Sequence, residues 1–147
     1  MRIYELVMTR KYVGQFKQEK LAKPEEAGDF LETTGIADKV QEHFIVVCLD
    51  TRNNTVMYQV TGVGSVDRCI ANPKDIFRAP IICGASKIVI AHNHPSGDLE
   101  PSVQDLRTTE QLVEAGKILN IQVIDHFIVG MTEGKYKWKS LRQCGYF

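Results

Sequence analysis

Short apolar segments alternate with turn-forming and amphipathic segments along the chain. The segment HFIVVCLD, residues 43–50, is too short and too rich in β-branched side chains for a helix. Turn-forming residues follow it and separate it from TVMYQVTGVG, so the two segments predict a β-hairpin. The segment SKIVIAH, residues 86–92, is almost continuously apolar, which is typical of a central strand that is covered on both faces.

Two further segments in the first part of the chain have helical features. The segment KPEEAGDFLETTG has a proline near its start, early acidic residues and a glycine at its end, which predicts a helix over about 24–34. Residues 72–85, NPKDIFRAPIICGA, have apolar spacing compatible with a helix, although Pro80 favours a kink or an early helical position. Residues 2–9, RIYELVMT, predict a leading strand.

A helix and a strand follow the predicted central strand. Residues 101–120 place their apolar side chains near helical spacing, and IQVIDHFIVG, residues 121–130, has the pattern of a strand. Strand, helix and strand in this order are typical of a βαβ unit with parallel strands. The chain is therefore predicted to fold as an α/β domain, with a mixed sheet flanked by helices.

The composition is that of an ordinary globular domain. Eighteen basic and eighteen acidic residues give no net charge, so the whole-protein field offers no long-range attraction to nucleic acid or to an anionic membrane. No stretch approaches the ~20 apolar residues of a membrane span, and the start lacks a signal peptide. The four cysteines form no CxxC pair, which favours reduced thiols. We expect one cytoplasmic domain over residues 1–147.

Two of the four histidines lie one residue apart at the end of the predicted central strand. Side chains two apart on a strand point to the same side, so His92 and His94 can converge on one point. Zinc binds neutral imidazoles, and a catalytic zinc site keeps one of its four positions for water. Asp105, in the first turn of the next helix, is the best candidate for the third ligand, because Asp98 and Glu100 lie in the loop. The spacing alone leaves open a hydrogen-bonded loop or a structural metal site.

Ser102 and Asp105 also have a purely structural explanation. Ser-x-x-acid is a signature of helix N-termini, in which the hydroxyl accepts hydrogen bonds from backbone N–H groups. The helix cap and the metal site therefore predict the same location for these two residues.

The stretch HNHPSGDLEPSVQD resembles the metal-binding signature of the JAB1/MPN/Mov34 metalloenzymes, the JAMM motif, and its wording is closest to the RadC family. Several further segments resemble successive RadC segments in the same order, over about residues 24–147: EHFIVVCLDTRNN, NPKDIFRAP, GASKIVIAHNHPSGD, IQVIDHFIVG and YKWKSLRQCG. The resemblance implies a three-layer-like JAB1/MPN fold, related to that of cytidine deaminases. Residues 41–147 would form its metal-binding core, and residues 1–40 an extension with a strand and a helix.

The resemblance also implies a role for each residue of the motif. His92, His94 and Asp105 would bind Zn²⁺, and Ser102 would stabilise the developing oxyanion. Glu42, immediately before HFIVV, matches the glutamate that these enzymes take from an early strand. The implied reaction is hydrolysis of an amide bond in a peptide or protein substrate. Two histidines and one carboxylate can also suit iron.

Asp125 and His126 alternate on the last long strand, so only one of them can face the site. We expect that residue to orient a zinc-bound imidazole, since metal-bound histidines usually donate their other N–H to a neighbouring group. A hydrogen-bonded core histidine is the alternative.

The sequence raises two alternatives to hydrolysis, DNA association and deamination. The segment KYKWKSLR alternates lysines, Lys135, Lys137 and Lys139, with Tyr136 and Trp138, which fits either a DNA-contacting surface or a lysine-protected edge strand. A non-catalytic or DNA-associated domain in repair or mobile-element contexts is thus the alternative function. A zinc deaminase is excluded, because its H-x-E and P-C-x-x-C signature is missing.

Overall fold

The computed structural model describes residues 20–64 and 71–147, together with residues 7, 9, 11 and 13. Over these residues the chain forms one five-stranded sheet in the order β2-β1-β3-β4-β5. The strands are β1 (His43–Leu49), β2 (Thr55–Val63), β3 (Lys87–Asn93), β4 (Gln122–Thr132) and β5 (Lys135–Ser140). The helices are α1 (Pro24–Thr33), the 3-10 turn η1 (Ile36–Asp38), α2 (Pro73–Cys83) and α3 (Val103–Leu119). Most of the strand predicted over residues 2–9 lies outside the described residues.

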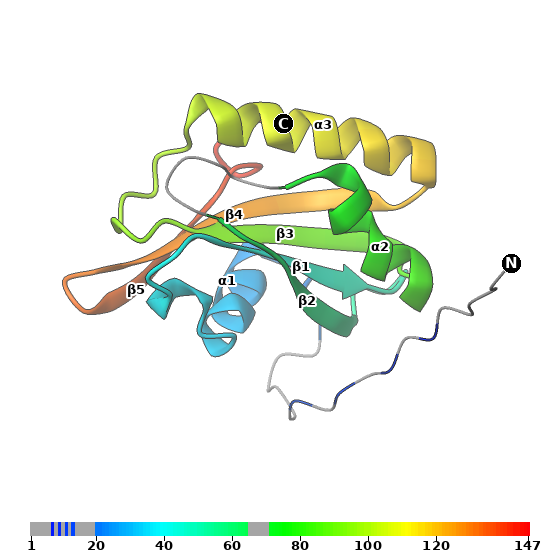
Figure 1. Ribbon diagram of the computed structural model, residues 1–147, viewed down its shortest axis with the longest axis horizontal. Helices are drawn as coiled ribbons and strands as arrows, with labels where there is room; N and C mark the ends of the chain where they lie inside the picture. Colours follow the sequence, from blue (N-terminus) through cyan, green and yellow to red (C-terminus); the bar gives the residue numbers. More distant parts are fainter. Residues whose placement is uncertain (1–6, 8, 10, 12, 14–19, 65–70) are drawn as a thin grey trace, which may run out of the picture.

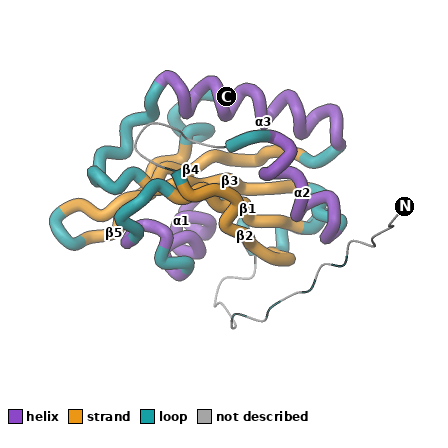
Figure 2. The backbone as a smooth tube through the Cα atoms, viewed as in Figure 1, coloured by secondary structure: helices purple, strands orange, loops and turns teal. Residues whose placement is uncertain are grey.

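Helices cover both faces of the sheet. Helix α1 and the turn η1 lie on one face, and α2 and α3 lie on the other, as Figures 1 and 2 show. Each face has its own apolar cluster: Phe30 and Leu31 of α1 pack in one, and Phe77 of α2 and Leu112 of α3 pack in the other. The predicted α/β class, with a mixed sheet flanked by helices, is confirmed.

The central strands are apolar throughout because both of their faces are covered. In β1, Ile45 and Val47 belong to the cluster on the α1 side, whereas Phe44 and Val46 belong to the cluster on the α2 and α3 side. Strand β3 alternates in the same way, with every residue after Lys87 buried. The predicted central strand and the predicted hairpin of β1 and β2 are both found.

Strands β3 and β4 pair in parallel, and α3 connects them. The other neighbouring strands pair antiparallel. Helix α3 begins after its N-cap Ser102 and ends at Asn120, whose φ of 55° is the left-handed conformation of a helix C-cap. The predicted βαβ unit is therefore present. Within the described ranges, no helix combines the length and the apolar character needed to cross a membrane.

Helix α2 holds Pro80 in its final turn rather than at its start. Proline removes one backbone N–H and with it the hydrogen bond to the carbonyl four residues earlier. The cost is small here because the helix ends three residues later, where Gly84 adopts the left-handed conformation with a φ of 68°. A proline this close to the C-terminus breaks little of the helix.

Strand β5 forms one edge of the described sheet. Its aromatic side chains, Tyr136 and Trp138, pack against the apolar cluster on the α1 side, and the Tyr136 hydroxyl donates a hydrogen bond to the Gly28 carbonyl at 2.9 Å. Lys135 and Lys137 are exposed on the other face of the strand. This arrangement agrees with the lysine-protected edge strand, since the aromatic rings are partly buried against the apolar cluster on the face opposite these two lysines.

Trp138 lies so close to Gly28 that a side chain at this helical position has no room. A Cβ atom on Gly28 would lie 2.4 Å from the Trp138 ring. Helix propensity alone would make Gly28→Ala stabilising by about 1 kcal/mol. We expect the steric conflict to reverse the sign and to lower the free energy of unfolding by about 1–3 kcal/mol, measured by urea denaturation.

Asp29→Ala is the matched control, because Asp29 is the exposed neighbour on the same helix. Its free energy of unfolding should change by no more than about 0.5 kcal/mol. An increase in stability for Gly28→Ala would contradict the observed packing of α1 on β5.

Candidate metal centre

Three side chains from β3, the loop after it and α3 converge on one point. His92 is the second-last residue of β3, His94 follows the strand, and Asp105 lies in the first turn of α3. One ligand atom from each residue lies within 4.8 Å of the other two. His92 Nε2 lies 2.9 Å from His94 Nε2 and 3.2 Å from Asp105 Oδ1. His94 Nε2 lies 3.5 Å from Asp105 Oδ2.

These separations fit a tetrahedral metal site. Ligand atoms about 2.0–2.1 Å from a tetrahedral ion lie about 3.3 Å from one another. The distances of 2.9 Å between the two histidine nitrogens and of 3.2 Å from His92 Nε2 to Asp105 Oδ1 are close to this value, whereas the 3.5 Å contact of His94 Nε2 is with the other carboxylate oxygen, Oδ2. Two imidazole nitrogens and a carboxylate oxygen are also ligands that zinc accepts. His92, His94 and Asp105 therefore form a cluster that can hold a metal ion.

The loop after β3 fixes the ring of His94. Its Nδ1 atom donates to the Asp98 carbonyl at 2.6 Å, so Nε2 is the nitrogen that faces the cluster. The backbone N–H of His94 donates to the Val129 carbonyl at 2.9 Å, and Gly97, with a φ of 79°, closes the turn. A Cβ atom on Gly97 would lie 2.4 Å from the Met131 carbonyl oxygen, so the turn depends on glycine.

Asp105 is buried, with 4% of its surface exposed, and every neighbour in contact with its carboxylate is a possible donor. The backbone N–H and the hydroxyl of Ser102 both donate to Oδ2 at 2.7 Å, which completes a capping box at the start of α3. Burial alone would raise the pKa of Asp105, but the hydrogen bonds from His92, His94 and Ser102 outweigh it and hold the pKa far below its usual value. The carboxylate is thus ionised.

His126 supports the cluster from β4, and Asp125 does not contact it. His92 Nδ1 lies 2.8 Å from His126 Nε2, and both rings are fully buried. Burial lowers the pKa of His126 well below its usual value, which keeps its ring neutral. The Asp125 carboxylate accepts hydrogen bonds from the Ser140 hydroxyl at 2.6 Å and from the backbone N–H groups of His126 and Arg142. It therefore anchors the turn after β5.

Glu42 lies directly before β1, at the same end of the sheet as the cluster. Phe44, two residues on, pairs with His92 in the register of β1 and β3, and its ring stacks on the His92 ring with an interplanar angle of 2°. Burial lowers the pKa of His94, but hydrogen bonds to Asp105 and Asp98 and the charges of Asp105 and, least of all, Glu42 raise it above its usual value. The structure thus brings Glu42 near the cluster.

Comparisons with known proteins agree with this geometry. The sequence profile of a RadC-like JAB domain matches residues 21–146. The chain belongs to the RadC-like JAB domain family. A UPF0758 protein of Staphylococcus haemolyticus is 34% identical to the RadC-like chain over 139 residues, which cover 94% of this chain and 59% of the relative. A UPF0758 protein of Methanosarcina barkeri is 33% identical over 134 residues, or 91% of this chain and 57% of the relative. A UPF0758 protein of Synechocystis is 44% identical over 106 residues, or 72% of this chain and 42% of the relative.

The RadC-like chain spans about half the length of these curated relatives, between 42% and 59%. The RadC resemblance found in the motif is confirmed by the family match.

Two residues of the RadC-like site were missed by the sequence reasoning. Asn93 lies between the two histidines in the sequence and is fully buried, but it points to the opposite side of β3. Its Oδ1 accepts from the His43 backbone N–H at 2.6 Å, and its Nδ2 donates to the Lys39 and Gln41 carbonyls at 3.1 Å. It thus holds the segment that carries Glu42. A buried polar residue inside an apolar strand was the available signal.

Thr109 is the second missed residue. It lies one helical turn after Asp105, and its hydroxyl contacts both the Asp105 carbonyl and His126. A threonine in an amphipathic helix gives no signal of such a role, because the sequence does not show which histidine lies opposite it.

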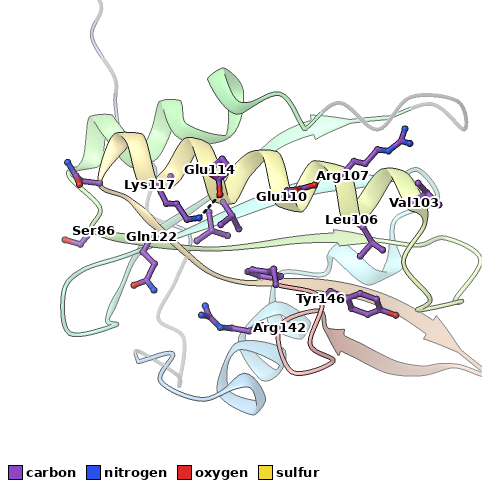
Figure 3. Close-up of a pocket in the computed structure, with 15 residues that line it drawn as sticks. Ser86, Val103, Leu106, Arg107, Glu110, Glu114, Lys117, Gln122, Arg142 and Tyr146 are labelled. Carbon is purple, nitrogen blue, oxygen red and sulfur yellow. Dashed lines mark hydrogen bonds and ion pairs between the residues drawn. The ribbon is translucent and has the colours of Figure 1, made fainter.

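The RadC-like domain has a separate hollow of about 940 Å³ between α3 and the C-terminal segment. Figure 3 shows Leu106 and Glu110 of α3 on one side of it and Arg142 and Tyr146 on the other. Apart from Gly116, the α3 residues that line it are not those buried against the sheet, and none of the three candidate metal ligands is among them. The hollow is therefore distinct from the metal centre.

The hydrogen bonds of Asn93 predict a measurable coupling between β3 and the Glu42 segment. Asn93→Ala removes three hydrogen bonds of about 0.5–1.5 kcal/mol each, so the free energy of unfolding should fall by about 1.5–4.5 kcal/mol. The backbone amide of His43 should then exchange its hydrogen faster, as measured by NMR.

Asn72→Ala is a control for this experiment, because Asn72 caps α2 through the Lys74 N–H. Asn72→Ala should lower the free energy of unfolding by about 1 kcal/mol and leave the hydrogen exchange of the His43 backbone amide unchanged. If the His43 amide of Asn93→Ala exchanged its hydrogen as slowly as in the wild type, Asn93 would not hold the segment that carries Glu42.

Proposed function

We propose that this domain is a zinc-dependent hydrolase that cleaves an amide bond, either a peptide or an isopeptide bond, in a peptide or protein substrate. The observation that supports the proposal is the convergence of His92 Nε2, His94 Nε2 and the Asp105 carboxylate, with one ligand atom of each residue within 4.8 Å of the others. Membership of the RadC-like JAB domain family supports the same conclusion.

The donor set favours zinc as the metal. His92, His94 and Asp105 supply three protein ligands, which is the number that catalytic zinc sites use. A zinc ion held by these three residues would supply Lewis acidity, which lowers the pKa of bound water toward ~7 and polarises a carbonyl group. The ionised Asp105 carboxylate offsets part of the charge of a divalent ion, and its hydrogen bonds from Ser102 keep it in place.

Glu42 is proposed as the general base and then the general acid. Its half-buried side chain stands at the start of β1 and close enough to His94 to affect its pKa. It would take a proton from the attacking water and deliver that proton to the leaving amine. Proton transfer by a positioned carboxylate typically contributes ~10²–10⁴ in rate.

Ser102 is proposed as the donor to the oxyanion that develops on the substrate carbonyl. Ser102 is exposed, and its hydroxyl donates to Asp105 Oδ2 at 2.7 Å. To act, the hydroxyl proton has to turn from this carboxylate to the substrate oxygen. The backbone N–H of Ser102 keeps its own hydrogen bond to Oδ2, so Asp105 retains a donor during the step. Losing one oxyanion donor typically costs ~2.7–4 kcal/mol.

Metal binding is the first test of this proposal. Tag-free wild-type protein should contain about one zinc per chain by elemental analysis, and Asp105→Ala should lose it. The substitution also removes half of the capping box, which should destabilise the fold by about 1 kcal/mol without unfolding it, as checked by circular dichroism.

Asp98→Ala provides the matched control, because it removes an exposed loop carboxylate while the backbone carbonyl that holds His94 remains. It should keep its zinc. Wild-type protein that neither contains zinc nor takes it up would overturn the proposal.

Hydrolysis should depend on Glu42 while metal binding does not. Glu42→Gln removes the proton acceptor and leaves all three metal ligands, so cleavage of peptide and isopeptide mixtures, followed by mass spectrometry, should slow by ~10²–10⁴ at unchanged zinc content. Glu25→Gln, at an exposed position of α1 on the other face of the sheet, should cleave at the wild-type rate. Full activity of Glu42→Gln would sink this mechanism. A zinc-loaded wild type that cleaves nothing but binds DNA in a salt-dependent manner would favour the DNA-associated alternative.

A further inference from the structure

The hollow beside α3 is a long groove. It is lined from Val103, at the start of α3, to Lys117, in the last turn of the helix, as Figure 3 shows. Lys117 lies fourteen residues after Val103, and at a rise of 1.5 Å per residue the helix covers about 21 Å between them. The volume of about 940 Å³ is near the upper limit for small-molecule pockets. The length of the groove therefore matches a segment of polypeptide.

Apolar side chains line both walls of the groove. Leu106 and Val113 come from α3, and Tyr146 and Phe147 come from the C-terminal segment. Val113 and Phe147 are partly buried and pack against the apolar cluster on this side of the sheet. Val103 and Tyr146, by contrast, are 67% and 45% exposed. The groove thus carries exposed apolar surface next to the core, which is typical of surfaces that bind proteins.

The backbone beside the groove favours a helical partner over an extended one. A buried extended peptide needs partners for its own N–H and C=O groups, which the open edge of a sheet usually supplies. On the edge of β4 next to the C-terminal segment, the Ile124 carbonyl already accepts from the Arg142 side chain. The His126 carbonyl accepts from the Leu141 N–H at 2.9 Å. A helix makes its backbone hydrogen bonds internally, so it can place an apolar face in the groove without such partners.

The two walls of the groove differ in charge. On the α3 wall, Arg107 and Lys117 balance Glu110 and Glu114, and Lys117 pairs with Glu114 at 2.6 Å. The C-terminal wall contributes Arg142, and none of the ion pairs among the described residues includes it. A complementary partner therefore carries a carboxylate on the side that faces the C-terminal wall.

Arg142 is held in place before any partner binds. Its backbone N–H donates to Asp125 Oδ1 at 3.2 Å, and its Nη1 atom donates to the Ile124 carbonyl at 2.8 Å. Its guanidinium carbon lies 5.7 Å from the centre of the Phe147 ring. A guanidinium has five N–H donors, so the donors that Ile124 does not use remain available for a carboxylate. An arginine that is already positioned loses less side-chain entropy on binding.

We propose that the groove between α3 and residues 141–147 docks an amphipathic helix of a partner protein, whose apolar face covers Leu106 and Tyr146 and whose carboxylate pairs with Arg142. The groove is separate from the metal centre, because none of the three candidate ligands lines it. The proposal does not depend on the proposed hydrolase activity.

The test selects binders from a display library of peptides of about fourteen residues. Leucines spaced by three and four residues are fixed to give one apolar face, and the other positions are randomised. Selection uses the wild-type protein with a chelator present, so that no peptide is retained through a metal. Enriched peptides should carry Asp or Glu beside the leucine face and should gain helical circular dichroism on binding.

Fluorescence anisotropy with the most enriched peptide then measures the contribution of each wall. Arg142→Ala and Leu106→Ser should each weaken binding by about 10-fold or more, with folding checked by circular dichroism. Arg142→Glu should regain affinity for a peptide whose acidic residue is replaced by lysine. Arg78→Ala and Val40→Ser are the matched controls, because these exposed residues do not line the groove, and both should bind within about twofold of the wild type.

Amide chemical shifts of the wild type locate the peptide without any variant. Adding the peptide should shift the amides of α3 and of residues 141–147 and leave those of β2 unchanged. A library that yields no binder, enriched peptides without an acidic residue, full affinity in Arg142→Ala, or shifts confined to other elements would each overturn the proposal. Peptide binding in the groove of a protein that takes up no zinc would support the docking surface and overturn the metal centre alone.

Discussion

The parallel pairing of β3 and β4 is the constraint on which the site depends. Parallel neighbours cannot be joined by a tight turn, so the chain must cross over the sheet, and α3 makes this crossing. The crossing starts where β3 ends, so the first turns of α3 lie over the end of the strand. Asp105 and Thr109 of α3 therefore reach the same buried region as His92 of β3 and His126 of β4.

Residues 92–94, at the end of β3, place polar side chains on both faces of the sheet. Alternation turns His92 toward the α3 side, where it meets His126 and Asp105, and turns Asn93 to the opposite side, where it binds the backbone before β1. Each side is satisfied by its own hydrogen bonds, as burial in a region of low dielectric requires. One short segment thus fixes both the candidate ligands and the segment that carries Glu42.

Much of the fold was predictable because its signals are local. The apolar run of β3, the turn between β1 and β2 and the Ser102 cap of α3 each follow from a few neighbouring residues. The order of strand, helix and strand predicted the parallel pair. Of the two alternatives predicted for Pro80, an early helical position is wrong, because Pro80 lies in the last turn of α2 and a pattern does not show how soon a helix ends after a proline.

The candidate site was predictable to the extent that its motif is contiguous. The resemblance of HNHPSGDLEPSVQD singled out His92, His94 and Asp105, which the structure brings together. The alternation of Asp125 and His126 indicated that one of them faces the site but not which one, since this depends on the register of β4 against β3. Asn93 and Thr109 act through partners far away in the sequence: a polar residue inside an apolar strand singles out Asn93, but no local pattern identifies the partners of either residue.

The loop between β3 and α3 is tied to its surroundings at several points. His94 binds β4 through its backbone, the Thr132 hydroxyl donates to the Gly97 carbonyl at 3.1 Å, and Lys139 pairs with Glu100. The conformational entropy of ordering this loop is therefore lost when the domain folds, and not when an ion arrives. In small zinc-finger domains, by contrast, folding and metal uptake are one event. An ion bound at the cluster would therefore exchange while the scaffold stays folded, and its identity would be set by supply and affinity after synthesis.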